Sequence, residues 1–239
     1  MMANITAIGF ESDELYDHAN KIAGQYHFAL DNKSLPRLNV TADKLELLTN
    51  NFLPLFVDFN SLTLQKRRDD GKKQGLIRAC KPAKGIRILD ATAGWGRDAG
   101  LLASFGAEVL MIEREPMMAA LLADGLNRLS SESSLKLSLV HADTKQYLQT
   151  LLELDYPDVI YIDPMHPERQ KSALVKKDMQ VLQHLIGADG DVRELIELAT
   201  TRTRNRVVVK WPQRLPGLLK TDACIDGKTV RFDIYLKRS

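Results

Sequence analysis

Short apolar runs alternate with amphipathic stretches from residue 85 onward. Each run is bounded by polar residues or glycine, so a buried strand is expected at each. The expected strands lie near 86–90, 108–112, 137–141, 158–162 and 206–210, with helices between them. Alternation of this kind indicates a parallel sheet. Residues 225–237 add a final hairpin that turns at Asp226 and Gly227, so the prediction is an α/β fold with a mostly parallel sheet and a late antiparallel strand.

The first 60 residues have a different pattern and are expected to form a small α/β extension. Short strands are predicted at 4–8 and 25–30 around a helix near 13–23, and residues 55–59 are predicted to form a further strand. A helical stretch over 62–81, interrupted near Gly71 and Gly75, should link this extension to the larger sheet. The predicted domains are therefore an extension over 1–60, a basic helical connector over 61–84 and a main domain over 85–239.

A loop with two glycines, Gly94 and Gly96, follows the predicted strand that ends at Asp90. Glycine lets the backbone approach a ligand closely, and the helix expected from Arg97 offers free N–H groups at its start. Glu113 ends the next strand, and an acidic residue about 20 positions after such a loop typically binds ribose hydroxyls. Nicotinamide dinucleotides and S-adenosylmethionine both fit this pattern, and an ordinary strand-loop-helix junction is the alternative without a ligand.

Details of the loop favour S-adenosylmethionine. A dinucleotide fingerprint needs Gly-x-Gly-x-x-Gly, but here the third glycine comes only at Gly100. A carboxylate at Asp98 would repel a pyrophosphate but is harmless beside a sulfonium, and Asp90 could meet the positively charged end of the cofactor. Trp95 is interpreted either as a lid beside the cofactor or as a core aromatic residue.

The segment Asp163-Pro164-Met165-His166-Pro167 follows the expected strand at 158–162. In open α/β folds ligands bind at the carboxyl edge of the sheet, where this turn should lie. The Asp163 carboxylate and a carbonyl beside Pro164 can accept hydrogen bonds from an exocyclic amine, aligning its lone pair and stabilising positive charge. His166 would stack on a base that has left its own stack. Asp163 could also take the released proton; the alternative is an ordinary strand followed by a proline turn.

Together these motifs resemble one bacterial family, the J-type guanine-N2 methyltransferases of small-subunit (16S) ribosomal RNA. The resemblance runs from about Phe56 to the C-terminus. It rests on the segments 90–98, 112–114, 163–167, 171–177, 207–212 and 231–235. It implies a class I, Rossmann-like methyltransferase fold, S-adenosylmethionine as methyl donor and the exocyclic N2 of a guanine in 16S ribosomal RNA as acceptor. It further implies cofactor contacts from the following residues: Arg97, Asp98, Glu113, Arg114, Asp143, Thr144 and Asp163.

Two features depart from the pattern of that family. His166 stands where the family usually has Phe or Tyr, and imidazole stacks on a base less extensively. Asp143 and Thr144 stand where it usually has two small hydroxyl residues, and an acidic residue there suits an adenine amino group. Both departures are interpreted as variation within the function.

Basic residues gather in three stretches, although the net charge of the whole chain is only +2. Clusters beside a catalytic loop suit a phosphate backbone, whereas a solvated helix face is the alternative. The first stretch holds Lys66, Arg67, Arg68, Lys72, Lys73, Arg78, Lys81 and Lys84. The second runs from Arg169 through Lys171 and Lys176 to Lys177. The third holds Arg202, Arg204, Arg206 and Lys210. RNA contacts are predicted for Lys66, Arg67, Arg68, Lys72, Lys73, Arg169, Lys171, Lys176 and Lys177.

Other features narrow the function further. No apolar run is long enough to span a membrane, no secretory signal opens the chain, and Cys80 and Cys224 suggest no disulfide framework, so a cytoplasmic protein is expected. No metal is predicted, because the histidines and cysteines lack ligand spacing. The alternatives are a methyltransferase for another RNA or DNA exocyclic amine, a methyltransferase for a protein amide, a nicotinamide oxidoreductase and a non-enzymatic RNA-binding module.

Overall fold

The computed structural model describes residues 6–50, 52–60, 62–69, 71–164 and 192–238. These residues form two compact units. Unit 1 contains 6–58 and 115–130, and unit 2 contains 59–114, 131–164 and 192–238. The predicted division into domains at residues 60 and 84 stays a prediction.

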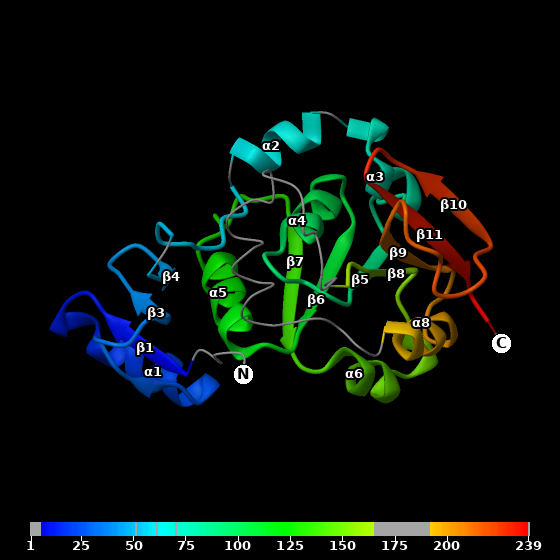
Figure 1. Cartoon of the computed structure of the whole chain (residues 1–239). Helices are drawn as coiled ribbons and strands as arrows, with labels where there is room; N and C mark the ends of the chain where they lie inside the picture. The colour runs from blue at the N-terminus through cyan, green and yellow to red at the C-terminus, as the bar shows by residue number, and fades with distance from the viewer. Residues whose placement is uncertain (1–5, 51, 61, 70, 165–191, 239) are drawn as a thin grey trace. The chain divides into compact units, whose positions relative to one another are not determined.

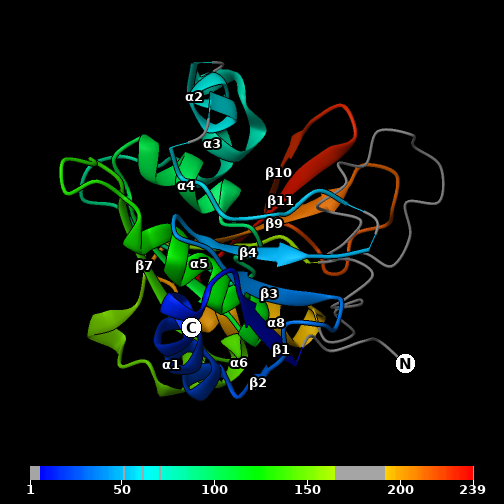
Figure 2. The ribbon, with the colours of Figure 1, turned by 90° about the vertical axis from the view of Figure 1, so that its left-hand side faces the viewer.

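Unit 1 is built on a four-stranded sheet in the order β2-β1-β3-β4. Its strands are β1 (Ala7–Phe10), β2 (Ala29–Leu30), β3 (Arg37–Val40) and β4 (Leu45–Leu48). Strand β1 runs parallel to β2 and β3, and β4 is antiparallel to β3. Helix α1 (Tyr16–Tyr26), preceded by a 3₁₀ turn over Asp13–Leu15, packs on β1 and β3 (Figure 2). Helix α5 (Pro116–Asn127) also belongs to this unit. The strands near 4–8 and 25–30 and the helix between them are confirmed with shifted ends, whereas β3 and β4 were not predicted.

The strand predicted over 55–59 is wrong. Only Leu55 pairs, through a single antiparallel bridge to Leu47, and the following residues have no regular structure. Burial explains the apolar residues of this segment, since Val57 is 2% exposed and Phe59 4% exposed. The apolar side chains therefore anchor an irregular segment by burial and do not build a sheet edge.

Unit 2 contains the larger sheet, with seven strands in the order β10-β11-β9-β8-β5-β6-β7 (Figure 1). The strands are β5 (Arg87–Asp90), β6 (Glu108–Glu113), β7 (Lys136–His141), β8 (Val159–Ile162), β9 (Arg206–Pro212), β10 (Ala223–Asp226) and β11 (Val230–Leu236). Strands β5 to β9 pair in parallel, and β11 is antiparallel to both β9 and β10. The five expected parallel strands, the final hairpin and the late antiparallel strand are confirmed.

Helices cover both faces of this sheet (Figure 1). The helical elements of this unit are α2 (Leu62–Asp69), which packs on α4, a 3₁₀ turn (Gly71–Lys73), α3 (Gly75–Cys80), α4 (Arg97–Ser104), α6 (Thr144–Thr150), a 3₁₀ turn (Glu153–Asp155) and α8 (Val192–Thr201). The breaks predicted near Gly71 and Gly75 are confirmed. Helix α3 packs on β9 and β11 and helix α4 on β6 and β7, whereas α6 and α8 pack together against the other face. At Gly75 an added Cβ would lie 2.5 Å from the Phe232 ring, which explains why α3 begins with glycine.

Burial on both faces explains the continuous apolar runs. Ile160 and Ile162 face the cluster that includes α8, whereas Tyr161 between them points the other way and is still only 1% exposed. In β9, Val207, Val208 and Val209 are all buried. Central strands that are covered on both faces have unbroken apolar sequences because the side chains on neither face are exposed to water. Within the described ranges, no helix combines the length and apolarity that crossing a bilayer requires.

Candidate cofactor and catalytic site

The glycine loop joins β5 to α4 at the carboxyl edge of the larger sheet. Gly94 and Gly96 have φ of 50° and 68°, a left-handed conformation that favours glycine. Gly96 is the N-cap of α4, and no side chain caps this end of the helix. The loop therefore has the two glycines in a conformation that favours glycine and, at the start of α4, a helix end that no side chain caps, as the sequence predicted.

Glu113 ends the neighbouring strand β6 and binds this loop directly. Its Oε2 accepts a hydrogen bond from the Gly94 amide at 3.0 Å, and the residue is 8% exposed. The carboxylate at the end of β6 is thus fixed beside the backbone that a nucleoside cofactor would approach. This position suits a carboxylate that binds ribose hydroxyls.

Asp90 lies at the base of the loop and is 1% exposed. Burial is the main cause that raises the pKa of its carboxyl to about 8, opposed by the Thr92 amide that donates to Oδ1 at 3.2 Å. Asp98, Asp163 and Glu113 raise this pKa further because they are negative neighbours. A buried acid among carboxylates is a site where a cationic group is favourable, so Asp90 fits the positively charged end of S-adenosylmethionine.

Asp90 should make the stability of the protein depend on pH. Between the unfolded pKa near 3.8 and the folded pKa near 8, the folded state binds one more proton. The contribution of Asp90 to the free energy of unfolding is therefore fully present at low pH, and it is lost as the pH rises toward 8. We expect the free energy of unfolding of Asp90→Asn, relative to the wild type without cofactor, to increase by about 1.4 kcal/mol per pH unit between pH 5 and 7. Denaturant unfolding across this range measures it, and a difference that does not change with pH would contradict the raised pKa.

Asp163 follows β8 and is tied to the same loop through its backbone. Its amide donates to Thr92 Oγ1 at 2.7 Å, and the Ala91 amide donates to the Tyr161 carbonyl at 2.8 Å. Pro164 next to it is buried. The turn after β8 and the loop after β5 therefore meet at one edge of the sheet, as the two motifs predicted.

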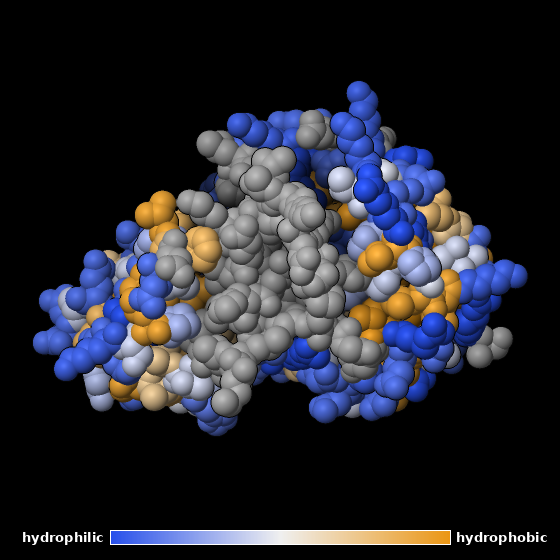
Figure 3. Space-filling view, viewed as in Figure 1, coloured by the Kyte–Doolittle hydropathy of each residue, from blue (hydrophilic) through white to orange (hydrophobic). Residues whose placement is uncertain are grey.

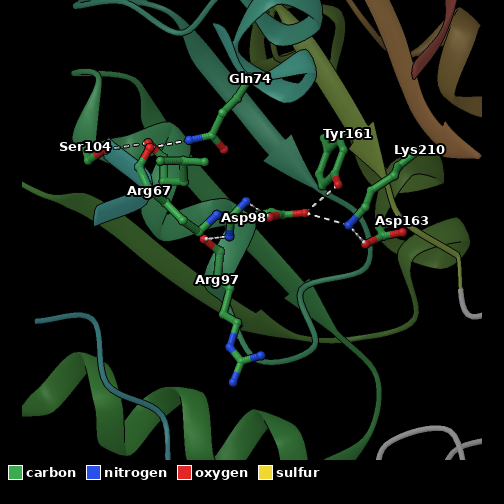
Figure 4. Close-up of polar contacts among 9 residues, drawn as sticks. Arg67, Gln74, Arg97, Asp98, Ser104, Tyr161, Asp163 and Lys210 are labelled. Atoms are coloured by element: carbon green, nitrogen blue, oxygen red, sulfur yellow. Dashed lines mark hydrogen bonds and ion pairs between the residues drawn. The ribbon is translucent and has the colours of Figure 1, made fainter. Parts of the chain in front are cut away.

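A network of ion pairs centres on Asp98, the second residue of α4 (Figure 4). Arg67 donates to Oδ1 at 2.7 Å, while the Tyr161 hydroxyl at 2.7 Å and the Lys210 ammonium at 3.2 Å donate to Oδ2. Lys210 also reaches Asp163 Oδ2 at 2.6 Å. Asp98 is therefore linked to the catalytic candidate Asp163 through Lys210.

The charges in this network are stabilised by one another. Burial alone would raise the pKa of Asp98, but Lys210, Arg67 and the Tyr161 hydroxyl hold it well below its usual value. Burial would likewise lower the pKa of Lys210, but Asp98 and Asp163 raise it above its usual value. Burial and the same two carboxylates raise the pKa of Tyr161, so its hydroxyl remains a donor. Asp98 and Lys210 are thus ionised across the physiological range.

Asp143 and Thr144 lie where α6 begins. Asp143 is its N-cap, and Oδ1 accepts from the Gln146 amide at 3.0 Å. The buried Thr144 hydroxyl donates to the Ala91 carbonyl at 2.7 Å, which ties α6 to the glycine loop. The structure therefore brings Thr144 to the loop, where it supports the backbone, whereas the Asp143 side chain caps α6.

Arg97 and Arg114 take different positions at this edge. The Arg97 side chain points away from Asp98 and is exposed (Figure 4). Arg114 follows Glu113, and its carbonyl lies 3.2 Å from His141 Nε2. Cofactor contacts of both arginines stay predictions. Trp95 is 7% exposed, which agrees with a packing residue.

The basic residues divide into groups that the sequence did not distinguish. Arg67, predicted to contact RNA, is paired with Asp98, whereas Lys66, Arg68 and Lys73 are exposed. The third stretch is split, because Lys210 is near the carboxyl end of β9 and the arginines are at its amino end. There Arg202 donates to the Tyr156 hydroxyl and Arg204 to the Leu154 carbonyl. Only Lys210 of this stretch reaches the candidate site.

Several predicted residues cannot be placed. His166 and the basic residues Arg169, Lys171, Lys176 and Lys177 lie outside the described residues, as does the side chain of Lys72. In the part of the chain that is described, no group of three His, Cys, Asp or Glu side chains is arranged to hold a metal ion.

Sequence reasoning missed the roles of Lys210 and Tyr161. In the sequence, Lys210 belongs to a basic stretch and Tyr161 to an apolar run, and neither pattern indicates a role in the site. A signal was present, because a lysine directly after three buried valines needs a partner for its charge. The identity of that partner depends on the register between β8 and β9, which the sequence does not give.

Comparisons with known proteins agree with this geometry. The family model described as "Putative SAM-dependent methyltransferase" matches residues 21–237. Ribosomal RNA small subunit methyltransferase J of Legionella pneumophila (strain Corby) is 59% identical over 237 residues, covering 98% of each chain. The protein of that name from Coxiella burnetii (strain Dugway 5J108-111) is 48% identical over 193 residues, 77% of this chain and 75% of its own. The crystal structure of the SAM-dependent methyltransferase NGO1261 from Neisseria gonorrhoeae matches with a TM-score of 0.75 and 26% identity, over 97% of this chain and 96% of that one.

The sheet order, the single antiparallel strand β11 and the glycine loop after β5 define a class I methyltransferase that uses S-adenosylmethionine. The full-length relatives narrow this class. The chain belongs to the ribosomal RNA small subunit methyltransferase J family. The predicted fold, enzyme class and cofactor are thereby confirmed.

Proposed function

We propose that this enzyme transfers a methyl group from S-adenosylmethionine to the exocyclic N2 of a guanine in 16S ribosomal RNA, in the cytoplasm. The observation that carries the proposal is the position of Asp163. Asp163 directly follows β8, its backbone amide donates to Thr92 of the glycine loop, and its carboxylate is oriented by Lys210 at 2.6 Å. A carboxylate fixed beside a cofactor loop suits an acceptor for an exocyclic amine.

The residues around the loop fit the cofactor. Asp90 would hold its cationic end, Glu113 its ribose hydroxyls, and Asp143 with Thr144 the side of the adenine. The bound cofactor supplies an electrophilic methyl group on a sulfonium. Methyl transfer would form the N–C bond at the expense of the S–C bond, and the nitrogen would then release one proton to solvent. Asp163 and a neighbouring carbonyl accept hydrogen bonds from the amine, which aligns its lone pair and stabilises the developing positive charge.

The RNA partner is supported by an exposed basic face. Lys66 and Arg68 of α2 and Lys73 just after it are exposed, and the surface over α2 is strongly hydrophilic (Figure 3). Such a face can bind phosphates at some distance from the target base. His166, by its position after Asp163, would stack on that base.

Mapping of methylated nucleotides tests the proposed function. Small-subunit ribosomal RNA is compared from cells with and without the gene, and RNA from the deficient cells is treated with purified enzyme and S-adenosylmethionine. We expect one guanine to lack its N2-methyl group in deficient cells and to regain it in vitro. A methyl group that returns to an adenine, to another atom or to DNA would contradict the proposal and favour a different exocyclic amine.

The basic face should contribute to RNA affinity but not to cofactor affinity. We expect replacement of Lys66, Arg68 and Lys73 with alanine to weaken RNA binding and to reduce its dependence on salt. The slope of log K against log[salt] should fall by about 0.7–0.9 for each lost phosphate contact. Fluorescence anisotropy at several salt concentrations measures this, and calorimetry with S-adenosylmethionine should give the wild-type value.

A matched control removes the same charge elsewhere. Lys21, Lys33 and Lys228 are also exposed, and their triple alanine variant should retain the wild-type salt slope. Equal effects of the two triple variants would mean that α2 contributes only general charge.

A further inference from the structure

Lys210 occupies an unusual position for a charged residue. It lies in β9 between Val209, 1% exposed, and Trp211, 8% exposed. Strand alternation directs Lys210 to the same face as Val208, opposite to the face on which Val209 and Trp211 join the core cluster. The parallel register pairs Ile162 with Val209, so one step further places Asp163 beside Lys210. The sheet itself therefore brings this ammonium to the turn after β8.

The Lys210 ammonium bridges two carboxylates from different elements. It lies 2.6 Å from Asp163 Oδ2 and 3.2 Å from Asp98 Oδ2, and its side chain is 27% exposed. Asp98 is fixed in turn by Arg67 at 2.7 Å and by the Tyr161 hydroxyl at 2.7 Å. Among the described residues, two cations and two carboxylates thus form a connected set of ion pairs whose charges sum to zero.

We propose that Lys210 is a positioning residue for methyl transfer: its ammonium, anchored by Asp98, holds the Asp163 carboxylate ionised and in one orientation toward the amine. This role rests on the proposed function, in which Asp163 accepts hydrogen bonds from the substrate. A carboxylate bound to an ammonium at hydrogen-bonding distance is a weaker base. Asp163 therefore stabilises charge and does not take the proton, which leaves to solvent after the N–C bond has formed.

Other titratable groups act on the ion pair of Lys210 and Asp163 and determine how turnover should depend on pH. In the described residues they are Asp98 of α4, Arg67 of α2, Tyr161 of β8 and Asp90 of β5. Without Lys210, the Asp163 carboxylate would lose the ammonium that bridges it to the carboxylate of Asp98. Since like charges favour protonation, turnover would then be lost at a higher pH than in the wild type.

The test compares Lys210→Met, Lys210→Arg and the wild type in turnover against pH. We expect Lys210→Met to lower kcat about a hundredfold, the cost of a misplaced catalytic group. The acid limb of its pH–rate profile should move to higher pH. Lys210→Arg keeps the charge and should restore both the limb and most of the turnover. The KM for S-adenosylmethionine should change little.

Two further variants separate positioning from damage to the fold. The double variant Lys210→Met/Asp98→Asn removes one charge of each sign, so the set stays neutral. Because Asp163 still lacks the ammonium that lay 2.6 Å away, the acid limb of this variant should still lie above that of the wild type. Lys136→Met breaks an ion pair of the same length, 2.6 Å to Glu108, at the amino end of β6 and β7, and should leave kcat unchanged.

Two results would overturn the role of Lys210. One is a Lys210→Met enzyme with wild-type turnover and acid limb. The other is a folded Lys210→Met enzyme with reduced turnover and an unshifted limb, because loss of packing alone produces that result. Each variant is compared with the wild type on the small-subunit nucleotide that the wild type methylates. If that nucleotide is not a guanine modified at N2, the methylated product differs from the proposed one, but the ratio of turnover between variants is unaffected.

Discussion

Replacement of Asp163 with asparagine is expected to lower the turnover of methyl transfer about a hundredfold or more, and replacement with alanine to lower it further. The main effect of this carboxylate is in the transition state, where the attacking nitrogen gains positive charge, and loss of such a preorganised group typically costs this much. Asparagine keeps the shape and one acceptor but removes the charge, whereas alanine removes both. Single-turnover assays with saturating RNA and cofactor measure the methyl-transfer step directly.

Binding measurements serve as the controls for these variants. RNA affinity should persist, because phosphate contacts elsewhere supply most of it. Affinity for S-adenosylmethionine should change less than turnover. Since both variants remove the ion pair between Lys210 and residue 163, circular dichroism should establish that each is folded. A folded Asp163→Ala enzyme with near-normal turnover would exclude this turn as the catalytic centre.

Replacement of Glu113 with alanine is expected to weaken S-adenosylmethionine binding by about 1–3 kcal/mol, the range for a lost hydrogen bond to a charged group. Two losses contribute, because the carboxylate is the proposed ligand of the ribose and also accepts from the Gly94 amide at 3.0 Å. Glu113→Gln keeps an acceptor for that amide and should have an intermediate effect. Isothermal titration calorimetry gives the affinities.

Strand β6 offers a matched control for this substitution. Glu108 lies at the opposite end of the same strand, where it pairs with Lys136 at 2.6 Å. Glu108→Ala removes the same charge from the same strand and should leave cofactor affinity unchanged. Equal losses from Glu108→Ala and Glu113→Ala would point to a general effect of charge, and unchanged affinity in a folded Glu113→Ala protein would remove Glu113 from the site.

The larger sheet could be predicted because its strands carry strong local signals. Apolar segments such as 159–162 and 207–209 are buried on both faces, so their hydrophobicity is continuous. In unit 1 the local signals are weaker, because Arg37 and Asn39 interrupt β3, Glu46 interrupts β4, and β2 has only two residues. Their pairing depends on tertiary contacts more than on local pattern, and for the same reason the apolar residues at 55–59 were wrongly predicted to form a strand.

The residues of the candidate site likewise divide into those that the sequence predicts and those that it does not. Asp90, Glu113 and Asp163 could be found because each ends a predicted strand, and parallel strands bring such ends to one edge. The partners of Asp98 could not be found in this way. Arg67 lies 31 positions before Asp98 in the chain, and Lys210 lies 112 positions after it. Contacts of this range are fixed by strand register and helix packing, so Arg67 was interpreted only as a member of a basic stretch.

The interior position of β11 has a consequence for folding. This late segment lies between β9 and β10, so β9 has an unpaired edge until β11 joins the sheet. Three consecutive buried valines form that edge, and exposed apolar strand edges are prone to pair with other chains. Aggregation through this edge therefore competes with folding until the final hairpin covers β9.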